Sequence, residues 1–174
     1  MIFKEIYNEH INRVFNLALH YVQNIEDAEE ITQDVFVKIH EAQSSFQFQS
    51  QMSTWIYRIT VNTCLDFLKS KTRKKRFAII KSLFNTNNEI VYDQIQFDHP
   101  GVKLEHKEKL QLLFKFINEL PFNQKTAIIL HKIEHISQNE IAKIMNLSPK
   151  AVESLVQRAK TNLQNKLIAS KELN

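Results

Sequence analysis

Residues 137–160 read SQNEIAKIMNLSPKAVESLVQRAK, and this stretch predicts two helices joined by a short turn. Ser137 and Glu140 have the spacing of a capping box, in which the hydroxyl accepts a free backbone N–H and the carboxylate reaches back to the cap. Asn146 tolerates the left-handed conformation that such a turn requires. Ser148, followed by a proline, marks a second helix start, because serine caps helices and proline fits the first helical position. Helix, three-residue turn and helix together predict a helix-turn-helix.

The second of these helices has two different faces. Its apolar residues recur at helical spacing and are expected to pack on the preceding helices: Val152, Leu155, Val156, Ala159, Leu163 and Leu167. Its opposite face carries polar side chains that we expect to be exposed: Lys150, Glu153, Ser154, Gln157 and Arg158. Long polar side chains near the start of such a helix suit contacts with base edges in the major groove. An ordinary helical hairpin with a solvated face is the alternative, so the motif alone leaves DNA binding open.

The composition indicates a helical protein with one medium domain or two small ones. The chain has 174 residues with one glycine and three prolines, and it is rich in good helix formers. No apolar run is long enough to cross a membrane, and the N-terminus does not resemble a signal peptide. Cys64 is the only cysteine, which excludes a disulfide framework. We therefore expect a protein of the reducing cytoplasm.

The net charge of +4 is unevenly distributed. Residues 1–67 hold four basic and nine acidic residues, whereas the next nine residues hold six basic residues and no acidic one. Residues 77–105 hold two basic and four acidic residues, and residues 106–174 hold eleven basic and six acidic ones. Two positive regions separated by an acidic spacer predict two contacts with one long polyanion.

Two helices are predicted in the first 42 residues. The first covers residues 2–23, and Asn24 is placed to cap the second. The buried side of the second helix is expected to contain Ala28, Ile31, Val35, Ile39 and Ala42. Its other side is more polar than burial requires and contains Gln33, Asp34, Val37, His40 and Glu41. An acidic solvated helix is the simplest interpretation of that second side.

A third helix is predicted from about Ser53 to about Lys75. One of its sides holds polar and basic residues that continue into a basic run: Arg58, Asn62, Lys69, Arg73, Lys74, Lys75 and Arg76. Aromatic residues lie close by in the sequence, namely Phe46, Phe48, Trp55 and Tyr57. Aromatic rings stack on unpaired bases while cations hold phosphates, but the same rings also fill small helical cores. Tyr57 is expected in the core, and for the other three aromatic residues both interpretations stay open.

The remaining segments predict a linker and two further helices. Residues 77–105 lose helical periodicity and contain the only glycine, so they are interpreted as a linker. Helices follow from about Leu104 to Leu120 and from Pro121 to Glu134.

The sequence contains only weak patterns for a catalytic or metal site. His131 and His135 have a spacing that suits two metal ligands on one helix face, but no third ligand lies nearby. We expect no metal, no cofactor and no enzyme activity.

Three separated motifs resemble one known family, in the same order as in that family. They are EDAEEITQDVFVKIHEA at residues 26–42, STWIYRITVNTCLDFLKSKTRKK at residues 53–75, and LPFNQKTAIILHKIEHISQNEIAKIMNLSPKAVESLVQRAKTNLQNKL at residues 120–167. Together they are similar to the sigma-70 family of bacterial RNA polymerase sigma factors, in the small extracytoplasmic-function group. Many members carry glycine where this chain has Asn146.

The resemblance implies an all-α protein of two small helical domains joined by a flexible linker. Residues 1–76 would form a region 2-like domain that binds the polymerase clamp and melts the minus-ten element. Residues 77–105 would be the linker, and residues 106–174 a region 4-like domain that contacts the minus-thirty-five element. By resemblance, residues 26–42 contact the clamp, Asn62 lies near a single-strand pocket, and the basic run contacts the DNA backbone. The polar face of residues 150–158 contacts the upstream element.

The implied partners are core RNA polymerase and promoter DNA, with no small-molecule substrate. Members of the family are commonly held by an anti-sigma factor, which is often bound to a membrane. Two other functions compete with this interpretation. A stand-alone helix-turn-helix regulator would occupy promoters without polymerase, and an enzyme or metal protein built around His131 and His135 would contain metal.

Overall fold

A computed structural model of the chain describes residues 3–43, 51–84 and 104–172, with side chains for residues 3–43, 51–75 and 109–170. These residues form helices and no strand, as the sequence predicts. They divide into two compact units. One contains α1, α2 and most of α3, and the other contains the first turns of α3 together with α4 to α7. In the part of the chain that is described, no helix has the length and apolar character that a membrane span needs.

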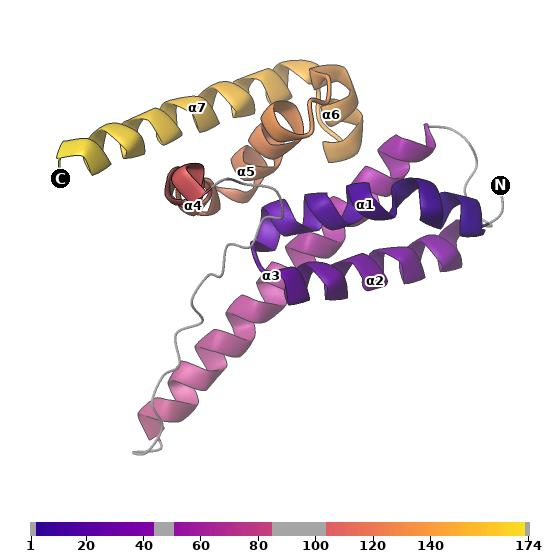
Figure 1. The fold of residues 1–174 in the computed structure, drawn as a ribbon, viewed down its shortest axis with the longest axis horizontal. Coiled ribbons are helices and arrows are strands. Elements are labelled where there is room, and N and C mark those ends of the chain that lie inside the picture. The colour runs from indigo at the N-terminus through magenta and orange to yellow at the C-terminus, as the bar shows by residue number, and fades with distance from the viewer. Residues whose placement is uncertain (1–2, 44–50, 85–103, 173–174) are drawn as a thin grey trace. The chain divides into compact units, whose positions relative to one another are not determined.

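The first unit is built on α1 (Phe3–Val22) and α2 (Ile25–Ala42), which pack side by side in Figure 1. Gln23 turns the chain between them with φ of 55°, and its backbone N–H donates to the backbone oxygen of Leu19 over 2.8 Å. Asn24 then caps α2, because its Oδ1 accepts from the Asp27 amide over 2.8 Å. The predicted cap is therefore confirmed. The largest fully buried side chains of this core include Ile6, Leu17, Tyr21, Ile31 and Ile39.

The third helix is longer than predicted. α3 covers Met52–Phe84, whereas the sequence placed its end near Lys75 and the start of the linker at residue 77. The prediction relied on the loss of an apolar stripe. However, residues 76–84 read RFAIIKSLF and contain neither glycine nor proline, so nothing in them stops a helix. Residues 85–103 of the predicted linker lie outside the described residues.

The second unit contains α4 (Leu104–Asn118), α5 (Phe122–Ile128), α6 (Gln138–Met145) and α7 (Pro149–Glu172). α5 and α6 both pack against α7, and the buried side chains of this unit include Leu130, Ile141 and Val152. The helix predicted over residues 121–134 changes character near its end, where η2 (Ile129–Ile133) is a π-helical turn. The Glu134 amide donates to the Ile129 oxygen over 3.0 Å, the wide spacing of that turn.

His10 should make the stability of the fold depend on pH. Its side chain is buried at 4% exposure, and its Nδ1 has no hydrogen-bond partner within the described residues. Burial lowers the pKa of His10 below its usual 6.5; Glu9 opposes this effect and Arg13 adds to it. The unfolded chain therefore binds a proton at a higher pH than the folded chain does. Stability is complete above about pH 6.5 and falls as the pH drops toward the lower pKa of the folded state.

Chemical denaturation between about pH 7.5 and pH 5 checks this expectation. In the wild type the free energy of unfolding should decrease as the pH is lowered. His10→Leu should remove a large part of this dependence on pH. His40→Leu, at an exposed position on α2, is the matched control. An equal slope in His10→Leu and the wild type would contradict the assignment.

Candidate nucleic-acid and polymerase interfaces

The helix-turn-helix has the predicted geometry, with one difference at its first cap. The Ser137 hydroxyl accepts from the Glu140 amide over 3.3 Å, as expected. The Glu140 carboxylate accepts a bond of 2.9 Å from that same hydroxyl, whereas a capping box would direct it to the backbone. Asn146 takes the left-handed conformation with φ of 54° and ψ of 48°. Ser148 caps α7 by accepting from the Ala151 amide over 3.2 Å.

α7 presents a polar face on a well-packed base. Val152, Val156 and Ala159 are buried, which fixes the rotation of the helix. The five polar residues predicted for DNA contact are all exposed: Lys150, Glu153, Ser154, Gln157 and Arg158. None of these five side chains has a hydrogen bond or ion pair within the described part of the chain. Their polar groups are thus available to a partner, and we call this set the α7 face.

α3 carries the second predicted set of DNA-binding residues. Arg58, Asn62, Lys69 and Arg73 follow one another at spacings of four or seven residues, and all four are exposed. Lys74 and Lys75 are exposed as well. In the second unit, the Arg58 guanidinium donates to the main-chain oxygen of Lys143. The side chain of Arg76 is not among the described ones.

Two of the four aromatic residues near α3 belong to the described part of the chain. Tyr57 is buried, as predicted, and its hydroxyl lies 3.2 Å from a carboxylate oxygen of Glu134 in the second unit. Trp55 is half-buried. Phe46 and Phe48 lie outside the described residues.

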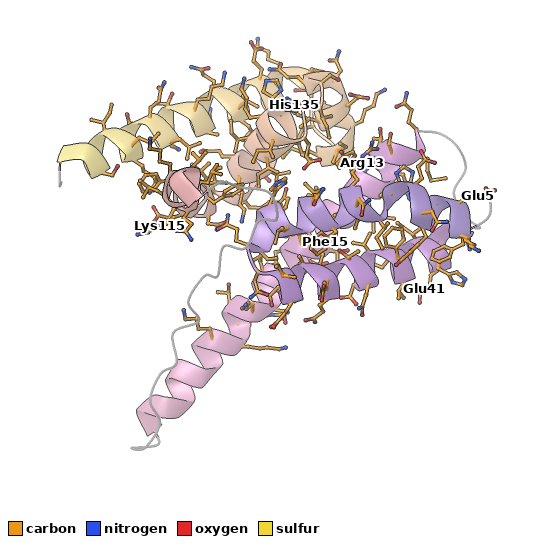
Figure 2. All side chains as sticks on the ribbon, viewed as in Figure 1. Glu5, Arg13, Phe15, Glu41, Lys115 and His135 are labelled. Carbon is orange, nitrogen blue, oxygen red and sulfur yellow. The ribbon has the colours of Figure 1, made fainter. Side chains whose placement is uncertain are left out.

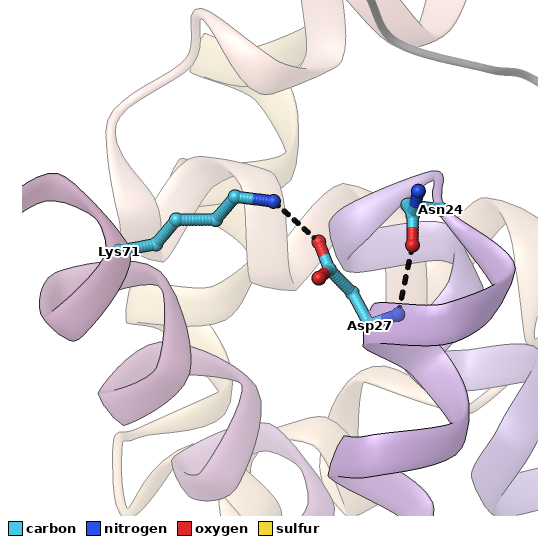
Figure 3. A network of polar contacts seen from close by, with 3 residues as sticks. All are labelled: Asn24, Asp27 and Lys71. Atoms are coloured by element: carbon cyan, nitrogen blue, oxygen red, sulfur yellow. Dashed lines mark hydrogen bonds and ion pairs between the residues drawn. The ribbon is translucent and has the colours of Figure 1, made fainter. Parts of the chain in front are cut away.

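Lys71, which lies between Lys69 and Arg73 in the basic run, forms an ion pair that the sequence did not predict. The Lys71 ammonium lies 2.7 Å from Oδ2 of Asp27, in the first turn of α2 (Figure 3). These two residues are 44 positions apart in the sequence. No local pattern identifies such a pair.

The polar side of α2 is exposed. All five residues predicted to contact polymerase are exposed: Gln33, Asp34, Val37, His40 and Glu41. Val37 is an apolar residue with 56% exposure, so it offers a partner protein an apolar contact among these polar side chains. On the adjoining edge, Lys38 donates to Thr63 Oγ1 over 3.0 Å and so ties α2 to α3. We call these five residues the α2 face, and Figure 2 shows Glu41 near the C-terminal end of α2.

An aromatic cluster that was not predicted from the sequence lies beside the α2 face. The rings of Phe3 and His40 lie 5.0 Å apart in an edge-on arrangement, and Tyr7 lies 4.7 Å from Phe36. Residues of α1 spaced by four and the end of α2 supply these rings. Phe3 and Tyr7 are spaced by four within the helix predicted over residues 2–23, but neither was predicted as a site residue.

In the described part of the chain, His131 and His135 belong to no group of three or more histidine, cysteine or acidic side chains that could hold a metal ion. His131 Nδ1 lies 3.3 Å from the Ile136 oxygen. His135 is exposed at the end of the π-helical turn, with φ of 55°, and is labelled in Figure 2.

An exposed basic helix followed by a helix-turn-helix is the pattern of charge and motif expected of a helical DNA-binding protein. Two family models match the chain in those same places. Residues 6–74 match Sigma-70 region 2, and residues 110–163 match Sigma-70, region 4.

Similar proteins agree with this assignment. An ECF RNA polymerase sigma-E factor of Haemophilus influenzae is 30% identical over 165 residues, which cover 95% of this chain and 87% of that protein. The factor of the same name from Escherichia coli is 30% identical over 156 residues, covering 90% and 81%. The chain belongs to the sigma-70 family of RNA polymerase sigma factors, in the extracytoplasmic-function group. It is a transcription initiation factor that binds core RNA polymerase and promoter DNA.

Two solved structures share the fold. CnrH in complex with the cytosolic domain of CnrY has a TM-score of 0.67 and 22% identity, covering 96% of this chain and 88% of that one. The sigma factor RpoE in complex with the anti-sigma factor NepR, from Bartonella quintana, has a TM-score of 0.65 and 24% identity, covering 95% and 96%.

Proposed function

We propose that the chain contacts core RNA polymerase through the α2 face and holds promoter DNA at two places. The α7 face contacts base edges of the minus-thirty-five element as duplex. The exposed residues of α3 hold the minus-ten region. The observation that carries this proposal is the availability of polar groups: the α7 face has no intramolecular partner within the described residues, although its helix is packed on the opposite side.

The minus-ten contact combines charge and stacking. Arg58, Lys69, Arg73 and the following Lys74, Lys75 and Arg76 supply cations for backbone phosphates. Asn62 supplies a hydrogen-bonding group on the same side of α3. Phe46, Phe48 and Trp55 supply rings on which unpaired bases stack once the duplex opens.

Two weak contacts on one polymerase support each other. Binding at one element raises the effective concentration of the chain at the other, so that neither has to be strong alone. In this division, residues 1–76 bind the clamp and the minus-ten element and residues 106–174 bind the minus-thirty-five element, with residues 77–105 as the connection. A stand-alone regulator is not favoured, because the region 2 match covers residues 6–74.

We further propose that the chain acts by binding and is not an enzyme, and that it works in the cytoplasm. Cys64 forms no disulfide, as suits a reducing compartment. An anti-sigma factor is a third proposed partner, since both structural neighbours named above were solved in complexes, one of them with an anti-sigma factor.

Reversing charges on the α2 face should weaken polymerase binding. Asp34→Lys with Glu41→Lys removes two exposed acidic groups and adds two cations, which should lower the association rate and the affinity for core enzyme. Neither residue has a hydrogen bond or ion pair within the described residues, so the helical circular-dichroism signal should not change. The measurement is core-enzyme affinity without DNA.

Asp66→Lys is the matched control for the single variant Asp34→Lys, because each reverses one exposed acidic charge and Asp66 lies on α3, outside the α2 face. It should leave the affinity for core unchanged. Unaltered affinity in the Asp34/Glu41 double reversal would remove the α2 face from the proposal.

A further inference from the structure

Lys71 differs from other cations of the basic run because its charge is paired inside the first unit. Its ammonium lies 2.7 Å from Oδ2 of Asp27 (Figure 3). Lys69, Arg73 and Lys74 are exposed and have no hydrogen bond or ion pair within the described residues. The run therefore contains a cation that the protein holds, Lys71, and three cations that are available to a partner, Lys69, Arg73 and Lys74.

Lys71 also lies on the packing side of α3. It follows Cys64 and Leu68 at spacings of seven and three, which keeps the three residues on one side of the helix. Cys64 is fully buried and Leu68 is half-buried. Lys69 and Arg73 are each two positions from Lys71, which places them on the opposite side. From residue 69 to residue 75 no side chain is buried, so the ion pair joins α3 to α2 beyond the apolar packing.

Asp27 is a well-fixed acceptor for this lysine. Its amide donates to the cap residue Asn24 over 2.8 Å, as Figure 3 shows. Its carboxylate lies in the first turn of α2, where the helix dipole favours a negative charge. The side chain of Asp27 is 19% exposed, whereas that of Lys71 is 47% exposed. The carboxylate is thus held in place, and the longer lysine side chain reaches to it.

We propose that Asp27 and Lys71 are a positioning pair that sets the direction of the basic part of α3. The pair aligns Lys69, Arg73 and Lys74 with the DNA backbone, and Lys71 itself does not bind phosphate. This inference rests on the proposed function, in which those three residues contact the minus-ten region. Asp27 on α2 and Lys71 on α3 would thus orient the contact between α3 and the DNA backbone without touching DNA themselves.

The test is the salt dependence of binding between a promoter fragment and holoenzyme reconstituted from core polymerase and the whole chain. Lys71→Met and Asp27→Asn should each weaken binding by about two- to fivefold, the range that an exposed ion pair supports. The double variant should bind no more weakly than either single one. The slope of log affinity against log salt should stay at the wild-type value in all three, because no phosphate contact is removed. Lys71→Arg keeps the pair and should retain full affinity.

Arg73→Gln separates a failure of this inference from a failure of the proposed function. It removes a phosphate contact, so the slope should become less steep by about 0.9. An unchanged slope in Arg73→Gln would reject the proposed function of the basic segment. A slope reduced by about 0.9 in Lys71→Met, with full affinity in Asp27→Asn, would instead show that Lys71 binds phosphate and overturn the positioning pair.

Discussion

Alanine at Gln157 or Arg158 should weaken holoenzyme binding to its promoter by about 1–3 kcal/mol, or about five- to 150-fold, because each substitution removes a hydrogen-bonding group from a base edge. Both side chains are exposed on α7 and lack an intramolecular partner within the described residues, so their removal should leave the fold intact. The measurement is promoter affinity together with transcription from a promoter that depends on its minus-thirty-five element.

Gln164→Ala is the matched control for this experiment. Gln164 is exposed, lies seven residues after Gln157 on the same side of α7, and is farther from the helix start that enters the groove. It should bind promoters like the wild type. Normal transcription in both Gln157→Ala and Arg158→Ala would exclude the α7 face as the contact with base edges.

Neutralising three cations of α3 should have the second large effect. Lys69→Gln, Arg73→Gln and Lys74→Gln together remove up to three phosphate contacts, and the salt slope should become less steep by about 2.7. The slope should also become less steep on pre-melted promoters, by about 2.1 where the contacted phosphates are single-stranded, because phosphates are present in both. The control is a triple variant at exposed lysines outside the run, Lys4→Gln, Lys109→Gln and Lys115→Gln. It removes the same amount of positive charge. An equal change of slope in this control would attribute the effect to net charge alone.

The sequence predicted those parts of the fold that depend on neighbouring residues. The caps at Asn24, Ser137 and Ser148, and the left-handed Asn146, are each decided within four residues, and the structure confirms all of them. Apolar periodicity likewise placed the α2 and α7 faces on the surface, because burial of one side of a helix leaves the other exposed.

Features that depend on tertiary distance were not predictable in this way. The pair Asp27–Lys71 joins helices whose angle no local pattern specifies. The end of α3 was placed too early, since a helix without a stop signal continues even when its apolar stripe ends. The π-helical turn of residues 129–133 has no clear sequence signal, although the left-handed conformation of His135 marks its exit.

Run-off transcription on a genomic promoter library, with purified core polymerase and with or without the chain, tests the central claim most directly. The claim is that one chain directs polymerase by contacting two promoter elements at once. Transcripts that need the chain should start at a fixed distance downstream of two shared sequence elements, and promoter occupancy should need core polymerase. Promoter occupancy by the chain alone, with no new transcripts when core is added, would contradict the account.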